Sequence, residues 1–202
     1  MNKERIILSD YDGTLAGWNS AFARYMANLG LPQLPNTDSE YSISVRHNIS
    51  VKHAMACITE FNEGERIGNI APFADSQEYV KKLANKGFRF IIVTSISSAP
   101  QAKYYRTQNA INLFGDIFEE INCIELGASK AHILTRWADT GYFWIEDHMR
   151  QAEAGHEVGL KTVLIKHPYN AHYKTSMFPV VSYESPWAEI YSMVCDEYDL
   201  DK

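Results

Sequence analysis

The sequence predicts an α/β fold of the doubly wound type, with a parallel sheet and a helical insertion after the first strand. Short apolar runs alternate with stretches of helical pattern, which is typical of βα units around a parallel sheet. Polar residues suited to catalysis follow several of these runs, where parallel strands end and open α/β folds bind ligands. The 58 residues from Leu15 to Pro72, between the first two strands, exceed what one crossover helix needs.

The first third of the chain is expected to hold one strand and two helices. The apolar run within Arg5 to Ser9 is the first strand, and a helix is expected from Gly17 to Leu29. The two prolines in residues 31–36 exclude a helix there and predict a connection. A second helix is expected from about Val45 to Phe61.

The rest of the chain alternates helices with strands. Asp75 and Glu78 form a capping-box pattern that is expected to open a helix, and Gly87 is expected to end it. Pro100 suits the first turn of a later helix. The remaining expected elements are strands at 88–93, 121–124, 142–145 and 162–165, a helix from Lys130 to Ala138, and a last helix from Pro186 towards Cys195.

Composition limits the classes of function. A chain of 202 residues suits one domain, with or without an insertion, and its net charge of −6 argues against a nucleic-acid duplex as partner. A small phosphorylated substrate remains compatible, because a bound divalent cation can reverse the local charge. We expect a cytoplasmic protein without a membrane span, since the start lacks a signal-peptide pattern and the three cysteines form no CxxC pair.

The most informative segment is Asp10-Tyr11-Asp12-Gly13-Thr14, which follows the first expected strand. Strand alternation would send the two carboxylates to opposite faces, unless the chain leaves strand geometry there. Gly13 and Thr14 allow such a turn, so both acids can converge. One carboxylate could then attack a phosphorus atom while the other handles protons, and both could help to hold a hard cation. A solvated turn is the simpler alternative.

Three more polar groups occur in a similar context. Thr94 and Ser95 end the second strand, Lys130 opens the helix after the third, and Glu146-Asp147 follow the fourth. Each has an ordinary explanation when taken alone: a strand-end hydroxyl, a solvated lysine or a helix cap. Their shared order at strand ends favours a functional role.

This order resembles the haloacid dehalogenase superfamily, in which a DxDGT start is followed by a strand-end Thr or Ser, a Lys and an acidic pair. The resemblance implies that Asp10 is a nucleophile forming an aspartyl phosphate and that Asp12 is the general acid and base. Thr94 and Lys130 would hold the phosphoryl oxygens. It also implies a Mg²⁺ site made by Asp10, the backbone carbonyl of Asp12 and a carboxylate of the acidic pair. We place that last contact on Asp147, with Glu146 acting through water; Glu146 as the direct ligand is the alternative.

Within that superfamily, the segment from Asp10 to Trp18 resembles the opening of the 5'(3')-deoxyribonucleotidases. Pro168-Tyr169-Asn170 and Trp187 near the end are similar too. Thr14 departs from the aliphatic residue frequent there, and Glu146 replaces the first of two aspartates. The resemblance implies a catalytic core of residues 1–14 and 73–202, with a small helical cap over residues 15–72.

The expected function is a Mg²⁺-dependent phosphomonoesterase, most similar to a nucleotidase that dephosphorylates deoxyribonucleoside monophosphates. Trp18 at the root of the cap is expected to stack on the base, while Gly13 and Ser95 complete the substrate site. One alternative is a phosphatase of the same superfamily for a sugar phosphate or another small metabolite. A second is a catalytically silent relative that binds a phosphorylated ligand.

Overall fold

The computed structural model describes residues 4–200, which fold around a parallel sheet. The strand order is β3-β2-β1-β4-β5-β6, and every neighbouring pair is parallel. The order reverses between β1 and β4, so the predicted doubly wound fold is confirmed. The strands of the described part of the chain are β1 (Ile6–Ser9), β2 (Arg89–Ser95), β3 (Phe118–Ile124), β4 (Phe143–Glu146), β5 (Lys161–Ile165) and β6 (Val180–Val181).

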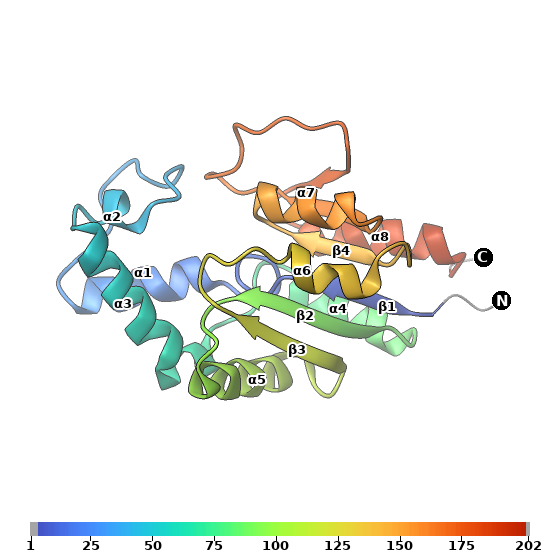
Figure 1. The fold of residues 1–202 in the computed structure, drawn as a ribbon, viewed down its shortest axis with the longest axis horizontal. Coiled ribbons are helices and arrows are strands. Elements are labelled where there is room, and N and C mark those ends of the chain that lie inside the picture. The colour runs from blue at the N-terminus through green and yellow to red at the C-terminus, as the bar shows by residue number, and fades with distance from the viewer. Residues whose placement is uncertain (1–3, 201–202) are drawn as a thin grey trace.

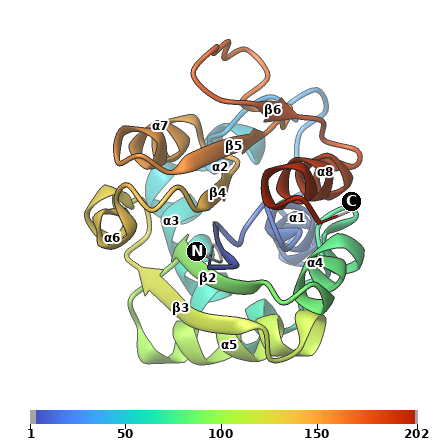
Figure 2. The same cartoon turned by 90° about the vertical axis from the view of Figure 1, so that its right-hand side faces the viewer.

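Helices cover both faces of the sheet (Figure 2). One face carries α6 (Ala131–Leu134), continued by η2 (Thr135–Trp137), and α7 (Met149–Glu157). The other carries α4 (Ser76–Asn85) and α8 (Pro186–Tyr198), while α5 (Pro100–Phe114) packs against β3 and α4. Among residues 4–200, no helix combines the length and the apolar character needed to cross a membrane.

Alternation along the strands divides the core into two apolar layers. Ile7 of β1 packs in the larger cluster, which includes Trp187 of α8, whereas its neighbour Leu8 packs with Trp144 and Leu134 on the opposite face. These side chains are fully buried. Because successive side chains of β1 point to opposite faces of the sheet, this strand contributes to both apolar layers.

A helical insertion follows β1, as predicted. Its elements lie at the end of the sheet towards which the strands point (Figure 1). The segments that enter and leave the insertion lie next to each other and are joined by backbone hydrogen bonds. The Gly17 amide donates to the Ala71 carbonyl at 2.9 Å, and the Phe73 amide donates to the Leu15 carbonyl at 2.9 Å. The insertion comprises α1 (Trp18–Asn28), α2 (Ile43–Arg46), α3 (Val51–Glu63) and η1 (Glu65–Asn69). The exact boundaries at 15 and 72 stay a prediction.

The expected single helix from Val45 to Phe61 is wrong. The chain forms α2, breaks over residues 47–50, and starts again as α3. Asn48 adopts a positive φ of 50°, which a continuous helix does not permit. The side chain of Ser50 then accepts a hydrogen bond from the His53 amide at 3.2 Å, so Ser50 is the N-cap of α3.

The capping box expected at Asp75 and Glu78 is also wrong. Asp75 makes no side-chain cap with α4, although α4 does start beside it. Its carboxylate accepts from the backbone amides of Trp187 at 3.1 Å and Ala188 at 2.9 Å, at the first turn of α8. Asp75 therefore caps a helix distant in sequence, and Glu78 pairs with Lys82 instead.

Candidate active site

Lys130 joins two acidic residues from different strands. Its Nζ lies 2.6 Å from Asp10 Oδ1, just beyond β1, and 2.7 Å from Glu146 Oε2, at the end of β4. The three side chains are 3%, 8% and 0% exposed. Burial alone would lower the pKa of Lys130, but the two carboxylates outweigh it and raise this pKa, so Lys130 is a buried cation.

The two members of the acidic pair have different partners. Glu146 Oε1 accepts the backbone N–H groups of Asp147 and His148, both at 3.0 Å, while its Oε2 accepts from Lys130. Asp147 accepts from the Tyr169 hydroxyl through Oδ2, and its backbone carbonyl accepts from Asn170 Nδ2 at 2.7 Å. Both oxygens of Glu146 therefore already accept hydrogen bonds from protein donors, so Asp147 is the better placed of the two to ligate a cation.

Gly13 brings the turn after β1 into contact with Asp147. Its φ is +79°, and a Cβ at this position would lie 2.4 Å from Asp147 Oδ2. The Gly13 carbonyl accepts from His167 Nε2 at 2.8 Å. Burial lowers the pKa of His167 to about 4, so this imidazole is neutral at pH 7. Only glycine satisfies both the backbone conformation and the space beside Asp147.

Asp12 binds a buried arginine that the sequence did not single out. Arg106 of α5 is fully buried, and its Nη2 lies 2.7 Å from Asp12 Oδ1 and 2.6 Å from Oδ2. The Asp12 side chain is 21% exposed. Burial raises the pKa of this carboxyl to about 6; Arg106 opposes that rise, and Asp10 adds to it. A group of that pKa can exist in either protonation state near neutral pH.

The cluster carries more negative than positive charge. Four carboxylates face two cations, and burial followed by the neighbouring carboxylates raises the pKa values of both Glu146 and Asp147. Oxygen atoms from three buried carboxylates, Asp10, Glu146 and Asp147, lie within 4.8 Å of one another. Such a donor set fits a hard divalent cation, whose charge would balance the two excess negative charges.

The two hydroxyls at the end of β2 differ in what they can offer a ligand. Thr94 is 1% exposed, and its Oγ1 has no hydrogen-bond partner among the described residues. Ser95 instead donates to the Glu125 carbonyl at 2.8 Å. An unsatisfied buried hydroxyl is costly, and a phosphoryl oxygen would satisfy it, so Thr94 fits the expected role better than Ser95.

Trp18 is packed within the helical insertion. One face of its indole stacks on Phe22, with ring centroids 4.5 Å apart, and the Phe61 ring lies nearly perpendicular to it, with a centroid-to-centroid distance of 5.9 Å. Its Nε1 donates to Asn62 Oδ1 at 2.8 Å. A nucleobase could therefore stack only on the opposite face of the indole.

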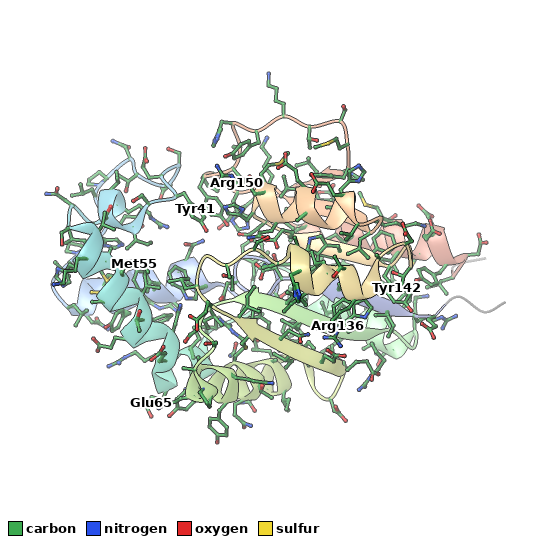
Figure 3. All side chains as sticks on the ribbon, viewed as in Figure 1. Tyr41, Met55, Glu65, Arg136, Tyr142 and Arg150 are labelled. Atoms are coloured by element: carbon green, nitrogen blue, oxygen red, sulfur yellow. The ribbon has the colours of Figure 1, made fainter. Side chains whose placement is uncertain are left out.

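Tyr41, in the loop before α2, extends towards the start of α7 (Figure 3). The centroid of its ring lies 5.3 Å from that of the His148 ring and 5.6 Å from that of the Tyr169 ring. The residue is 65% exposed. Desolvation, then the carboxylates of Asp147 and Glu146, raise the pKa of its hydroxyl to about 12. Tyr41 is thus an exposed aromatic side chain of the insertion that contacts Tyr169, the hydrogen-bond donor to Asp147.

The sequence-predicted residues divide into two groups in space. Asp10, Lys130, Glu146 and Asp147 form one connected cluster, and Asp12 lies beside it on the turn after β1. Trp18 and Ser95 make contacts elsewhere. Sequence reasoning missed Arg106 and Tyr41, because a lone arginine inside a helix and a tyrosine in a loop carry no local signal.

No protein-family model matches the sequence, and no curated protein matches it either. Solved structures do resemble it. A haloacid dehalogenase-like hydrolase from Streptococcus pneumoniae is 16% identical with a TM-score of 0.64, covering 96% of this chain and 100% of its own. CbbY from Rhodobacter sphaeroides, solved with phosphate, is 18% identical with a TM-score of 0.61, covering 93% and 96%.

A phosphoglycolate phosphatase from Haemophilus somnus, itself described as predicted, is 16% identical with a TM-score of 0.62, covering 96% of this chain and 99% of its own. A mutant of the Rhodobacter CbbY was also solved with xylulose-(1,5)bisphosphate. At these identities the likeness establishes the fold. The chain therefore has the fold of haloacid dehalogenase-like hydrolases over almost its whole length.

Proposed function

We propose that this protein is a Mg²⁺-dependent phosphomonoesterase that works through an aspartyl phosphate on Asp10. The observation that carries the proposal is the 2.6 Å ion pair of Lys130 with Asp10, beside Asp147, at the carboxyl ends of β1 and β4. Open α/β sheets bind their ligands there. Phosphoryl transfer also requires this inventory: a nucleophile, a cation to offset phosphoryl charge and carboxylates for a metal.

In the first step, a carboxylate oxygen of Asp10 bonds to phosphorus and the ester P–O bond breaks. Asp12, in its protonated form, gives its proton to the departing oxygen, so the products are an alcohol, the Asp10 phosphate and the Asp12 carboxylate. Lys130 and the Thr94 hydroxyl would bind phosphoryl oxygens, a role supported by the buried cation of one and the buried, unpartnered donor of the other.

In the second step, the Asp12 carboxylate removes a proton from water as the water oxygen bonds to phosphorus. The bond between phosphorus and Asp10 breaks, inorganic phosphate leaves, and Asp10 is again a carboxylate beside Lys130. A carboxyl with a pKa of about 6 suits both the acid and the base role near neutral pH.

The metal proposal assigns the direct carboxylate contacts to Asp10 and Asp147, with the backbone carbonyl of Asp12 as a further oxygen ligand. Glu146 would act indirectly, because its two oxygens already bind Lys130 and two backbone amides. Mg²⁺ would offset negative charge on the phosphoryl group and on the acidic cluster.

The favoured substrate class is the deoxyribonucleoside monophosphates. The resemblance around Asp10 to Trp18 supports it, and so does an exposed aromatic ring, Tyr41, beside the acidic cluster. A flat aromatic ring offers a surface on which a nucleobase can stack. A sugar phosphate has no such π-face.

A sugar phosphate or another small metabolite phosphate is the second candidate. The structural likeness to CbbY favours it, since that protein was solved with phosphate and, as a mutant, with xylulose-(1,5)bisphosphate. The packing of Trp18 against Phe22 also leaves less of the indole for a base.

A phosphate-release screen over nucleoside monophosphates and sugar phosphates, with Mg²⁺ or with EDTA, tests the proposal. The Asp10→Asn variant, purified in the same way, is the control for contaminating phosphatases. We expect Mg²⁺-dependent release that is highest for deoxyribonucleoside monophosphates and absent from the variant. Higher release from sugar phosphates would select the second candidate. No release from any ester, together with binding of phosphate esters, would indicate a silent relative.

A further inference from the structure

We propose that Arg106 is a positioning residue that fixes the orientation of the Asp12 carboxylate; this inference rests on the proposed function. Both oxygens of Asp12 lie within 2.7 Å of Arg106 Nη2. The two residues are 94 positions apart in the sequence, so the contact depends on how α5 packs against the turn after β1.

The side-chain hydrogen bonds of Arg106 go to the Asp12 carboxylate. Arg106 is fully buried, and neither its Nε nor its Nη1 has a hydrogen-bond partner among the described residues. Burying a guanidinium that uses one of three nitrogens is unfavourable, since the unpaired donors lose their water. A residue kept only for stability would be replaced at little cost by an apolar side chain of similar volume.

A second set of contacts holds the guanidinium in place. Arg106 Cζ lies 4.2 Å from the centroid of the Tyr11 ring, which is a cation–π contact. The Tyr11 hydroxyl donates to Asn109 Oδ1 at 2.8 Å, and Asn109 lies three residues after Arg106 on the same face of α5.

The same helix face is tied to the helical insertion. Asn109 Nδ2 donates to the carbonyl of Ile70 at 2.9 Å and to that of Gly68 at 3.3 Å, where the insertion returns to the core. Arg106 therefore packs on the Tyr11 ring, and Asn109 fixes that ring by joining its hydroxyl to the end of the insertion.

This arrangement determines what Arg106 can do in the reaction. Asp12 must present the same carboxyl twice, first to the leaving oxygen and then to the attacking water. An aspartate on a turn, 21% exposed, has rotamer freedom that would misplace that carboxyl. The Arg106 contact with both Asp12 oxygens restricts this freedom, so Arg106 acts on the reaction through Asp12.

Substrates with different leaving groups separate this role from a merely structural one. An alkyl phosphate requires a proton on its leaving oxygen, whereas the nitrophenolate of p-nitrophenyl phosphate departs without one. For Arg106→Met, we expect kcat/KM for a deoxyribonucleoside 5'-monophosphate to fall by about 10- to 100-fold, and that for p-nitrophenyl phosphate by less than about threefold. Arg106→Lys, which keeps the charge, should give an intermediate loss with the same preference.

A double-mutant cycle with p-nitrophenyl phosphate completes the experiment. In the wild-type background, Arg106→Met should lower kcat for this ester by about tenfold, because hydrolysis of the aspartyl phosphate still uses Asp12 as base. In an Asp12→Asn background, Arg106→Met should change kcat by less than about twofold, because Arg106 then has no carboxylate to position. Arg136→Met is the matched control: Arg136 forms an exposed ion pair with Glu120 and should leave every rate unchanged. Circular dichroism verifies folding, and Arg106→Lys carries the test if Arg106→Met does not fold.

Equal losses of kcat/KM for the two substrates in the Arg106 variants would overturn the inference. So would a loss in the Asp12→Asn background as large as in the wild type. Failure of the proposed function looks different, because wild-type protein would then hydrolyse neither ester.

Discussion

The two ends of the sheet hold their ion pairs in different environments. At the amino ends, Arg89 pairs with Glu119 and Lys161 with Glu197, and all four side chains are between 29% and 49% exposed. At the carboxyl ends, Lys130 pairs with Asp10 and Glu146 at exposures of 8% or less. Exposed pairs contribute about 0–1 kcal/mol, whereas a buried pair must first overcome the loss of hydration.

The difference indicates which charges serve function. A buried cluster of one lysine and several carboxylates is not an economical way to stabilise a sheet, because apolar side chains of similar volume often do as well. Perturbed carboxyl pKa values concentrate at the same end of the sheet, at Asp12, Glu146 and Asp147. Charge buried at this end is therefore better explained by chemistry than by stability.

Removing the proposed nucleophile should give the largest effect. Asp10→Asn is nearly isosteric, and its amide oxygen can still accept from Lys130, but it cannot attack phosphorus. Turnover should fall by at least about 10⁴-fold, with a far-UV circular dichroism spectrum like that of the wild type. Steady-state phosphate release measures the loss, and near-normal turnover would contradict the assignment of Asp10.

Lys130→Met tests the buried ion pairs at the carboxyl ends of the strands. It leaves Asp10 and Glu146 without their cation, so we expect activity to fall by about 10²–10³-fold and the free energy of unfolding by about 3–5 kcal/mol. Lys161→Met is the matched control at the exposed end and should change the free energy of unfolding by less than about 1 kcal/mol. Urea unfolding compares them, and equal destabilisation by the two variants would refute the contrast.

The acidic pair allows a sharper comparison, between two adjacent carboxylates. EDTA should stop turnover and Mg²⁺ should restore it. Asp147→Asn should raise the Mg²⁺ concentration for half-maximal activity by about tenfold or more, because it alters the proposed direct ligand. Glu146→Gln should shift that concentration less and lower kcat more, since Glu146 holds Lys130. The reverse order would mean that Glu146 is the direct ligand.

Trp18 and Tyr41, the two candidate base-stacking residues of the insertion, give the smallest expected effects. Trp18→Ala should raise KM for a deoxyribonucleoside monophosphate about tenfold more than for a small non-nucleotide phosphate ester, and it should also destabilise the protein by removing the contacts with Phe22 and Phe61. Tyr41→Ala should raise KM for the nucleotide without loss of stability, because Tyr41 is 65% exposed. Equal changes in KM for both esters would favour the metabolite phosphatase.

The parts of the fold that the sequence predicts depend on local signals. Apolar runs such as Ile6–Leu8 and Tyr142–Ile145 predict buried strands, and candidate site residues follow these runs in the sequence. Parallel strands then bring Asp10, Lys130 and Asp147 to one edge without further information. The residues that carry the resemblance are far apart in the sequence, and the parallel strands bring them into one connected cluster.

The parts that it does not predict depend on tertiary contacts. Asp75 and Glu78 match a capping box, yet Asp75 caps α8, because the free amides of Trp187 and Ala188 are brought beside it. Arg106 lies in a polar helix, and only the packing of α5 places it on Asp12. The break before Ser50 shows that a local cap can also interrupt a helical pattern.

The most direct measurement of the central claim is identification of the phosphorylated residue. Wild-type protein mixed with substrate and Mg²⁺ is quenched in acid, reduced with borohydride, which converts an aspartyl phosphate to homoserine, and digested for mass spectrometry. We predict homoserine at position 10 in the wild type and none in Asp10→Asn. Homoserine at Asp12 or Asp147, or rapid turnover with no modified residue, would contradict the account.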